Sequence, residues 1–171
     1  GIDVWSYING FEYGFDYYEI KNGSLGQNKT LTTTGDLTEL SNGNVAIVYS
    51  TEDDRQARDL KISIIDMNEP KIEHDVWLTS LDQQYVGWGS KVIQYDEEHI
   101  LVGWNTFDDN QGTGSHFILT RLDGTLTTEA HSLEKSVLYP AQSFKKSADG
   151  KSIIFVSEEG GELKVHVIDI N

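Results

Sequence analysis

The feature that most constrains this chain is a series of short segments in which apolar and polar residues alternate with a period of two. These segments are rich in β-branched and aromatic residues and end at Gly, Asn or Asp, as β-strands do. No window of a dozen residues carries an apolar stripe at helical spacing. The sequence therefore predicts an all-β protein, with its clearest strands at 45–49, 60–65, 90–95, 100–104, 117–120, 153–156 and 163–168.

The predicted strands recur in a fixed order, which indicates a structural repeat. Each unit has a strand, a tight turn, an apolar second strand, a longer loop, a third strand that ends in Asp, and an outer strand. The second strands begin at Val45, Ile100 and Ile153, a spacing of roughly 50 residues that suits the four-stranded blades of a propeller. We expect the longer loops at 52–59, 105–115 and 158–161.

This order divides the chain into a partial blade (1–33), two full blades (34–80 and 81–136) and a second partial blade (137–171). We therefore predict one propeller-like domain that is part of a larger ring. A β-sandwich is the alternative, because it also has evenly spaced strands. An incomplete ring exposes strand edges, so we expect another copy or an upstream chain to complete it.

One segment also resembles a known family. Residues 145–157 read Lys-Lys-Ser-Ala-Asp-Gly-Lys-Ser-Ile-Ile-Phe-Val-Ser and precede a strand ending at Asp169. They resemble the WD40-like (PD40) propeller repeat of the TolB family, Ser-Pro-Asp-Gly-Lys-Lys-Ile-Ala-Phe, with Ala148 in place of the proline. The other units keep only the outline of this pattern. The resemblance implies a propeller and a periplasmic or exported location, but no activity, because propellers host many functions.

Composition excludes several classes of protein. The chain has 13 basic and 28 acidic side chains, a formal charge of -15. This charge argues against nucleic-acid binding, which needs a basic surface, and against docking to an anionic membrane. With no cysteine, the chain has no disulfide, thiolate nucleophile or iron–sulfur cluster. No apolar run approaches the roughly 18 residues that cross a bilayer.

Aromatic residues are concentrated near the N-terminus at odd-numbered positions, so that most would share one face of a strand. Stacked rings beside carboxylates would suit a sugar, because the rings contact its CH groups and the carboxylates accept from its hydroxyls. The alternative is packing between blades. We take as candidate ligand-binding residues Trp5, Tyr7, Tyr13, Trp88 and Trp104.

An acidic loop at 108–114 is the candidate metal site. Asp108 and Asn110 place oxygen atoms at alternate positions before Gly112, and calcium prefers several oxygen ligands around a tight turn. The loop lacks the bidentate Glu of an EF-hand, and a solvated loop is the alternative. No other cofactor is predicted, since the five histidines are too scattered for a zinc site.

The predicted function is a non-catalytic binding or assembly module that recognises a protein or a glycan through the loops of a propeller. The sequence contains no phosphate-binding loop, dinucleotide fingerprint or nucleophile elbow. Two alternatives stay open. One is a glycan-active hydrolase or lyase that uses carboxylates in the propeller funnel, and the other is a structural subunit of an extracellular assembly. The acidic composition and the lack of cysteine favour a periplasmic or extracellular location.

Overall fold

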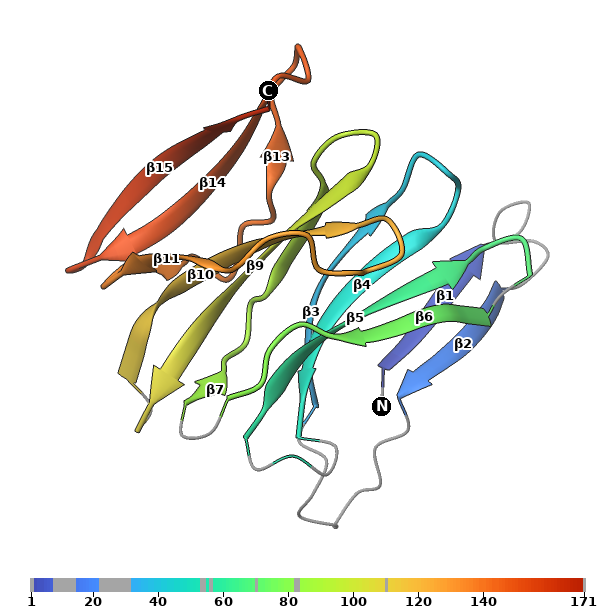
Figure 1. Cartoon of the computed structure of the whole chain (residues 1–171), viewed down its shortest axis with the longest axis horizontal. Helices are drawn as coiled ribbons and strands as arrows, with labels where there is room; N and C mark the ends of the chain where they lie inside the picture. Colours follow the sequence, from blue (N-terminus) through green and yellow to red (C-terminus); the bar gives the residue numbers. More distant parts are fainter. Residues whose placement is uncertain are drawn as a thin grey trace.

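The computed structural model describes residues 2–7, 15–21, 32–52, 55, 57–69, 71–81, 84–109 and 111–170, with the backbone alone for 2–7 and 15–21. These residues form four antiparallel sheets and contain no helix (Figure 1). The prediction of an all-β protein is confirmed for this part of the chain.

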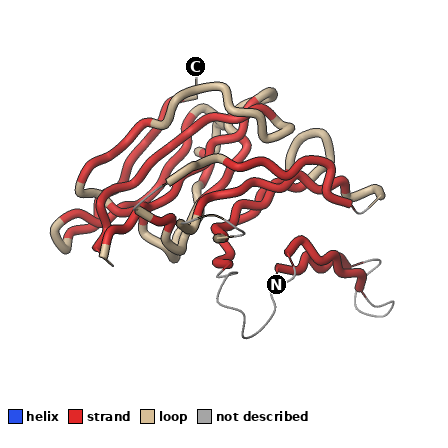
Figure 2. Tube along the Cα trace, turned by 60° about the horizontal axis from the view of Figure 1, so that its bottom comes forward, coloured by secondary structure: helices blue, strands red, loops and turns tan. Residues whose placement is uncertain are grey.

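The N-terminal sheet is a hairpin of β1 (Ile2–Tyr7) and β2 (Phe15–Lys21). Its register sets Trp5 opposite Tyr17 and Tyr7 opposite Phe15. Figure 2 shows the hairpin, which carries the N label, as a separate pair of strands. Of the partial blade predicted for 1–33, only this hairpin and the last two positions are described, and those two positions belong to the next sheet.

Sheet 1 is a four-stranded meander in which each strand pairs with the next. Its strands are β3 (Thr32–Glu39), β4 (Val45–Thr51), β5 (Asp59–Asp66) and β6 (Lys71–Trp77). The four strands span residues 32–77, whereas the sequence predicts this unit at 34–80.

Sheet 2 repeats this meander with an interrupted first strand. Two short strands, β7 (Tyr85–Val86) and β8 (Lys91–Gln94), both pair with β9 (His99–Asp108). The sheet continues with β10 (Gln111–Arg121) and β11 (His131–Glu134).

Sheet 3 follows the same plan with one strand fewer. Its interrupted first strand consists of β12 (Val137–Leu138) and β13 (Lys145–Lys146), which both pair with β14 (Ser152–Glu159). The last described strand, β15 (Glu162–Asp169), pairs with β14. Figure 1 shows this sheet at the upper left, with the C-terminus above it.

The tight turns before β4, β9 and β14 lie where the sequence predicts them, and all three use the same side-chain contact. Asn42, Asp96 and Asp149 each accept a hydrogen bond from the backbone N–H two residues later, at 2.8–3.1 Å. A short polar side chain stabilises a turn by such a bond. Gly43 and Gly150 supply the positive φ, 87° and 73°, that their two turns require.

Two predicted loops are wrong. Residues 105–115 are not a long loop, because β9 and β10 run on as a hairpin with Asp109 at its tip. At 158–161 the strands also run on, and only Gly160 and Gly161, both with positive φ, separate β14 from β15. In both cases the polar side chains of a two-faced antiparallel strand resemble a loop in sequence. The opposite holds for the outer strand of sheet 2, which the sequence predicts at 125–132 and which begins only at His131.

The main core lies between the sheets. Val48 and Ile62 of sheet 1 pack with Val102 and Trp104 of sheet 2. Residues that alternate onto the other side of sheet 2 pack against sheet 3, in a second cluster that contains Leu101, Phe117, Leu138, Phe144, Ile153 and Phe155. Sheet 2 is therefore buried on both faces.

The three sheets share one structural element that the sequence does not reveal. An aromatic residue of the second strand lies opposite a basic residue of the third: Tyr49 opposite Lys61, Trp104 opposite His116, and Phe155 opposite His166. In sheets 2 and 3 the ring stacks on the histidine, with centroids 5.4 and 4.6 Å apart. The histidine Nε2 lies 2.7 Å from the hydroxyl of Thr106 or Ser157. The three sheets thus share an aromatic–basic pair at the same place in their strand order.

Candidate ligand-binding cleft

The first strand of each sheet is broken near its middle. In β3 the break is a bulge, where Gly35 and Asp36 together oppose one residue of β4. In sheet 2 residues 87–90 separate β7 from β8, and in sheet 3 residues 139–144 separate β12 from β13. A bulge or break redirects side chains away from the strand and often borders a functional site.

The three breaks pack against one another through small residues. A Cβ on Gly35 would lie 2.9 Å from the carbonyl oxygen of Ser90, and a Cβ on Gly89 would lie 2.8 Å from the Cβ of Pro140. The Lys91 ammonium donates to the Pro140 carbonyl. Neighbouring sheets thus approach closely at their breaks, and this contact needs glycine at both positions.

An open cleft of about 1060 Å³ lies where these breaks meet. Residues from all three sheets line it, so no single sheet could form it alone. The residues of the lining that carry rings or polar side chains are Thr33, Thr34, Asp36, Trp88, Lys91, Asn105, Phe107, Lys135, Tyr139, Ser143 and Glu158.

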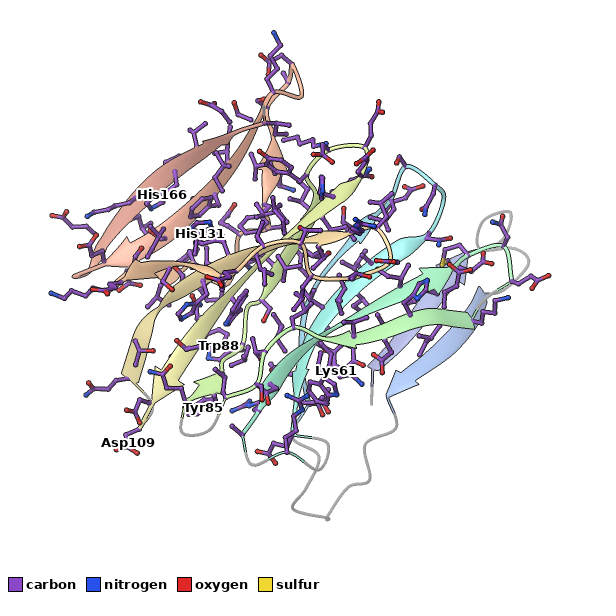
Figure 3. The ribbon with its side chains drawn as sticks, viewed as in Figure 1. Lys61, Tyr85, Trp88, Asp109, His131 and His166 are labelled. Atoms are coloured by element: carbon purple, nitrogen blue, oxygen red, sulfur yellow. The ribbon has the colours of Figure 1, made fainter. Side chains whose placement is uncertain are left out.

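Trp88 is the most accessible ring of the cleft. Its side chain is 61% exposed, and Figure 3 shows it next to β7. Tyr139 and Phe107 also line the cleft. A large exposed indole is unusual, because burial of its apolar surface is favourable. Trp88 can therefore gain stabilisation by stacking on a ligand.

The polar lining includes a buried carboxylate oxygen that lacks a partner. Asp36 Oδ1 accepts a 3.0 Å hydrogen bond from the Leu37 N–H. Asp36 Oδ2 is buried and has no hydrogen-bond partner among the described residues. Buried polar atoms are nearly always paired, so this oxygen can accept a bond from a ligand donor or a water.

Lys91 is the buried cation of the cleft, 4% exposed. Burial lowers its pKa from the ordinary 10.5, and the negative charge of Asp36 partly opposes this effect. Because its ammonium already donates to Pro140, Lys91 stabilises the wall and supplies positive charge near the Asp36 carboxylate. The cleft thus combines an aromatic surface with the acidic groups of Asp36 and Glu158 and the basic groups of Lys91 and Lys135.

Asn105 fixes the wall formed by sheet 3. Its side chain is buried in β9, accepts a 2.8 Å bond from the Leu138 N–H and donates a 3.1 Å bond to the Leu138 carbonyl. The amide therefore pairs with β12 as a neighbouring strand would. These two hydrogen bonds hold sheet 3 to sheet 2 beside the cleft.

The structure places the predicted ligand-binding residues in different surroundings. Trp88 lines the cleft. Trp104 is only 3% exposed and lies in the core between sheets 1 and 2, where it contacts protein rather than solvent. Trp5 and Tyr7 belong to β1, which is described by its backbone alone, and Tyr13 lies outside the described residues.

The predicted metal loop is only partly described. Asp108 is exposed at the end of β9 opposite Gln111, and Asn110 lies outside the described residues. Among the residues with known placement, no group of three or more His, Asp or Glu side chains is arranged to hold a metal ion. Calcium binding at this hairpin tip stays a prediction.

Of the residues that line the cleft, the sequence predicts only Trp88 as a binding residue, and Asp36, Lys91 and Tyr139 are among those it does not predict. Each stands in or next to a break in a first strand, and Gly35, Gly89 and Pro140 mark these breaks in the sequence. Glycine and proline inside a strand pattern indicate a bulge or an interruption. That signal predicts where a strand breaks, but it does not predict that three breaks meet.

A smaller cavity of about 410 Å³ lies between sheets 2 and 3. It is lined mainly by apolar residues that include Phe117, Phe155 and Leu133. His131 and His166, labelled in Figure 3, stand at its border. It offers fewer polar groups than the cleft.

Comparison with known proteins gives no relative: no family model, no curated protein and no solved structure matches the chain. In the part of the chain that the structure describes, no helix has the length and apolar character needed to span a membrane.

Proposed function

We propose that this protein is a non-catalytic, propeller-type binding module that holds a glycan in the cleft formed by the three strand breaks. The observation that carries the proposal is the exposed indole of Trp88 in the same cleft as the unpaired, buried Asp36 Oδ2. A sugar ring presents both an apolar CH face and hydroxyl donors, and so it suits both groups.

The chemistry of the cleft favours a glycan over an apolar ligand. Besides the rings, its lining carries the hydroxyls of Thr33 and Ser143 and the carboxylate of Glu158. Binding sites typically combine apolar surface with a few oriented polar groups. A neutral or basic sugar suits the cleft better than an acidic one, because the chain carries a formal charge of -15.

The arrangement of the sheets supports the propeller part of the proposal. Three consecutive antiparallel meanders pack in series, and each begins with its broken strand at the cleft. In a propeller the first strands of the blades lie together in this way around the axis. The likeness to the TolB repeat and the periplasmic or extracellular location stay predictions beside this proposal.

Calorimetric titration with a panel of neutral, amino and acidic oligosaccharides tests the function. We expect at least one neutral or amino sugar to bind, and Trp88→Ala to weaken this binding by about tenfold or more, since truncating an aromatic anchor of a binding site costs on the order of 2 kcal/mol. The matched control is Leu126→Ala, which removes an exposed side chain far from the cleft lining.

A second variant tests the polar contact. Asp36→Asn keeps the shape of the side chain but replaces the carboxylate, and we expect it to weaken sugar binding severalfold because hydrogen bonds to charged groups are the stronger ones. Absence of binding across the panel, or sugar binding that neither variant changes, would refute a glycan site in this cleft.

A further inference from the structure

The outward face of sheet 3 is apolar and uncovered. Three side chains of β15 point away from sheet 2 and are among the most exposed large apolar residues described: Leu163 at 63%, Val165 at 70% and Val167 at 61%. On β14, Ile154 and Val156 lie directly opposite Val167 and Val165 and are half-buried. Together these five residues form the outer face.

Equivalent positions of the other two sheets are buried. The residue that follows the basic member of the aromatic–basic pair is Ile62 in sheet 1, Phe117 in sheet 2 and Val167 in sheet 3. Ile62 is 0% exposed beneath sheet 2, and Phe117 is 8% exposed beneath sheet 3. In both cases another β-sheet provides the cover. The outer face therefore has the pattern of an interface between sheets, but nothing covers it within the described residues.

The charges around the outer face permit self-association. Although the chain carries -15 overall, the centre of the face is uncharged. Lys145, which lies opposite Ile154, brings a positive charge to the same side as Glu158 and Asp169. Two copies can therefore meet here without bringing together two strongly acidic surfaces.

Sheet 1 of a second copy cannot cover the outer face of sheet 3. On sheet 1, the face that corresponds to the Trp104 side of sheet 2 carries Ile47, Tyr49 and Ile65, and these residues are already 1–2% exposed. Sheet 1 of a second copy thus cannot pack on the outer face as sheet 2 packs on sheet 1 and as sheet 3 packs on sheet 2. The same outer face of the second copy is accessible.

We propose that two copies of this protein associate through the outer face of sheet 3, which packs on its counterpart across a twofold axis. Two aliphatic sheet faces then form a sandwich-like layer, with strands aligned at a small angle. A twofold contact of this kind uses the same patch on both subunits. It covers the exposed residues of β15.

The mass in solution is the first test, measured by light scattering over a dilution series of the chain. We expect a species of twice 19.2 kDa that dissociates on dilution, and a single-chain mass for Val165→Lys and for Val167→Lys. Both positions are exposed, so these variants keep the fold of the single chain. Leu126→Lys, an exposed apolar residue outside the outer face, is the control and should retain the wild-type mass.

Oxidative cross-linking is the second test, and it depends on the absence of cysteine from the chain. Val165 lies near the middle of β15 and hence near the expected axis, so Val165→Cys should form a disulfide-linked pair of chains, whereas Leu126→Cys should not.

Three results would overturn the proposal. One is a single-chain mass for the wild type at every concentration. The outer face would then be covered by a different protein or by a further part of a longer chain. Another is association that both lysine variants retain. The third is association that the lysine variants abolish but Val165→Cys does not cross-link, since this would indicate a head-to-tail contact.

Discussion

Sheets 2 and 3 are built on the same plan but differ in their surroundings. Both have an interrupted first strand, a stacked aromatic–histidine pair and a hydroxyl bonded to the histidine. Sheet 2 is packed on both faces, and sheet 3 on one. Phe117 is consequently buried, whereas the equivalent Val167 is exposed.

The alternating pattern of these strands therefore indicates two faces that can pack against another sheet, but it does not indicate whether both faces are covered. The outward positions of β15 are as apolar as their buried equivalents in β5. A free apolar face beside an edge strand is normally avoided, because it promotes association. The contrast between covered and uncovered positions can be measured as a difference in the unfolding free energy that their truncation costs.

The largest expected difference in unfolding free energy is between Ile62→Ala and Val167→Ala. Ile62 is fully buried between sheets, and truncating such a side chain costs about 2–5 kcal/mol of unfolding free energy. Truncating the exposed Val167 should change it by less than about 0.5 kcal/mol. Urea denaturation of dilute protein measures both values. Equal costs would contradict the difference in burial.

A smaller effect concerns the link between sheets 2 and 3. Asn105→Ala leaves the N–H and carbonyl of Leu138 without their side-chain partner, and an unpaired buried polar group costs about 1–3 kcal/mol. Val156 holds the equivalent position in sheet 3, and Val156→Ala should cost less because this side chain is only half-buried. If Val156→Ala proves the more destabilising, Asn105 does not link the sheets.

The histidine of sheet 2 should make stability depend on pH. Burial lowers the pKa of His116 from the ordinary 6.5. Below pH 6.5 the unfolded chain takes up this proton before the folded chain does, so the unfolding free energy should fall as the pH decreases from 6.5 toward the lower, folded-state pKa. Denaturation curves of the wild type and His116→Gln between pH 8 and pH 5 check this, and an unchanged slope in the variant would contradict it.

The smallest expected effect on stability concerns two equivalent turns, one with Asn42 and the other with Asp149. The Ser147 hydroxyl and the Lys151 N–H bond to the Asp149 carboxylate and lower its pKa from the ordinary 3.8. The charged form stabilises the fold above pH 3.8, and this contribution is lost as the pH falls through the lowered pKa.

Asp149→Asn should therefore leave stability at neutral pH almost unchanged, since Asn42 already makes the corresponding bond. It should also reduce the loss of stability in acid. Acid denaturation monitored by circular dichroism distinguishes the two proteins. A large loss at neutral pH would show that the carboxylate has another role in this turn.

Much of the fold could be predicted from local sequence. The turns at Asn42 and Asp149 were predictable because Asn-Gly and Asp-Gly pairs favour tight hairpins. The strands that begin at Val45 and Ser152 were predictable because their β-branched residues lie between such turns. These features depend on a few neighbouring residues.

The cleft depends on contacts between residues far apart in the chain. Gly35 meets Ser90 and Gly89 meets Pro140, and no local pattern reveals these pairs. For the same reason the sequence alone could not separate Trp104 in the core from Trp88 in the cleft. Both tryptophans follow a glycine, and only the packing of whole sheets distinguishes their exposure.

Hydrogen–deuterium exchange, with and without the best-binding oligosaccharide of the panel, tests most directly whether three equivalent sheets form one binding site. We expect the sugar to slow exchange together in 33–36, 87–91 and 137–143, the segments at the three breaks that line the cleft, and to leave β15 unchanged. Slowed exchange in only one of these segments, or in β1 and β2 instead, would contradict it.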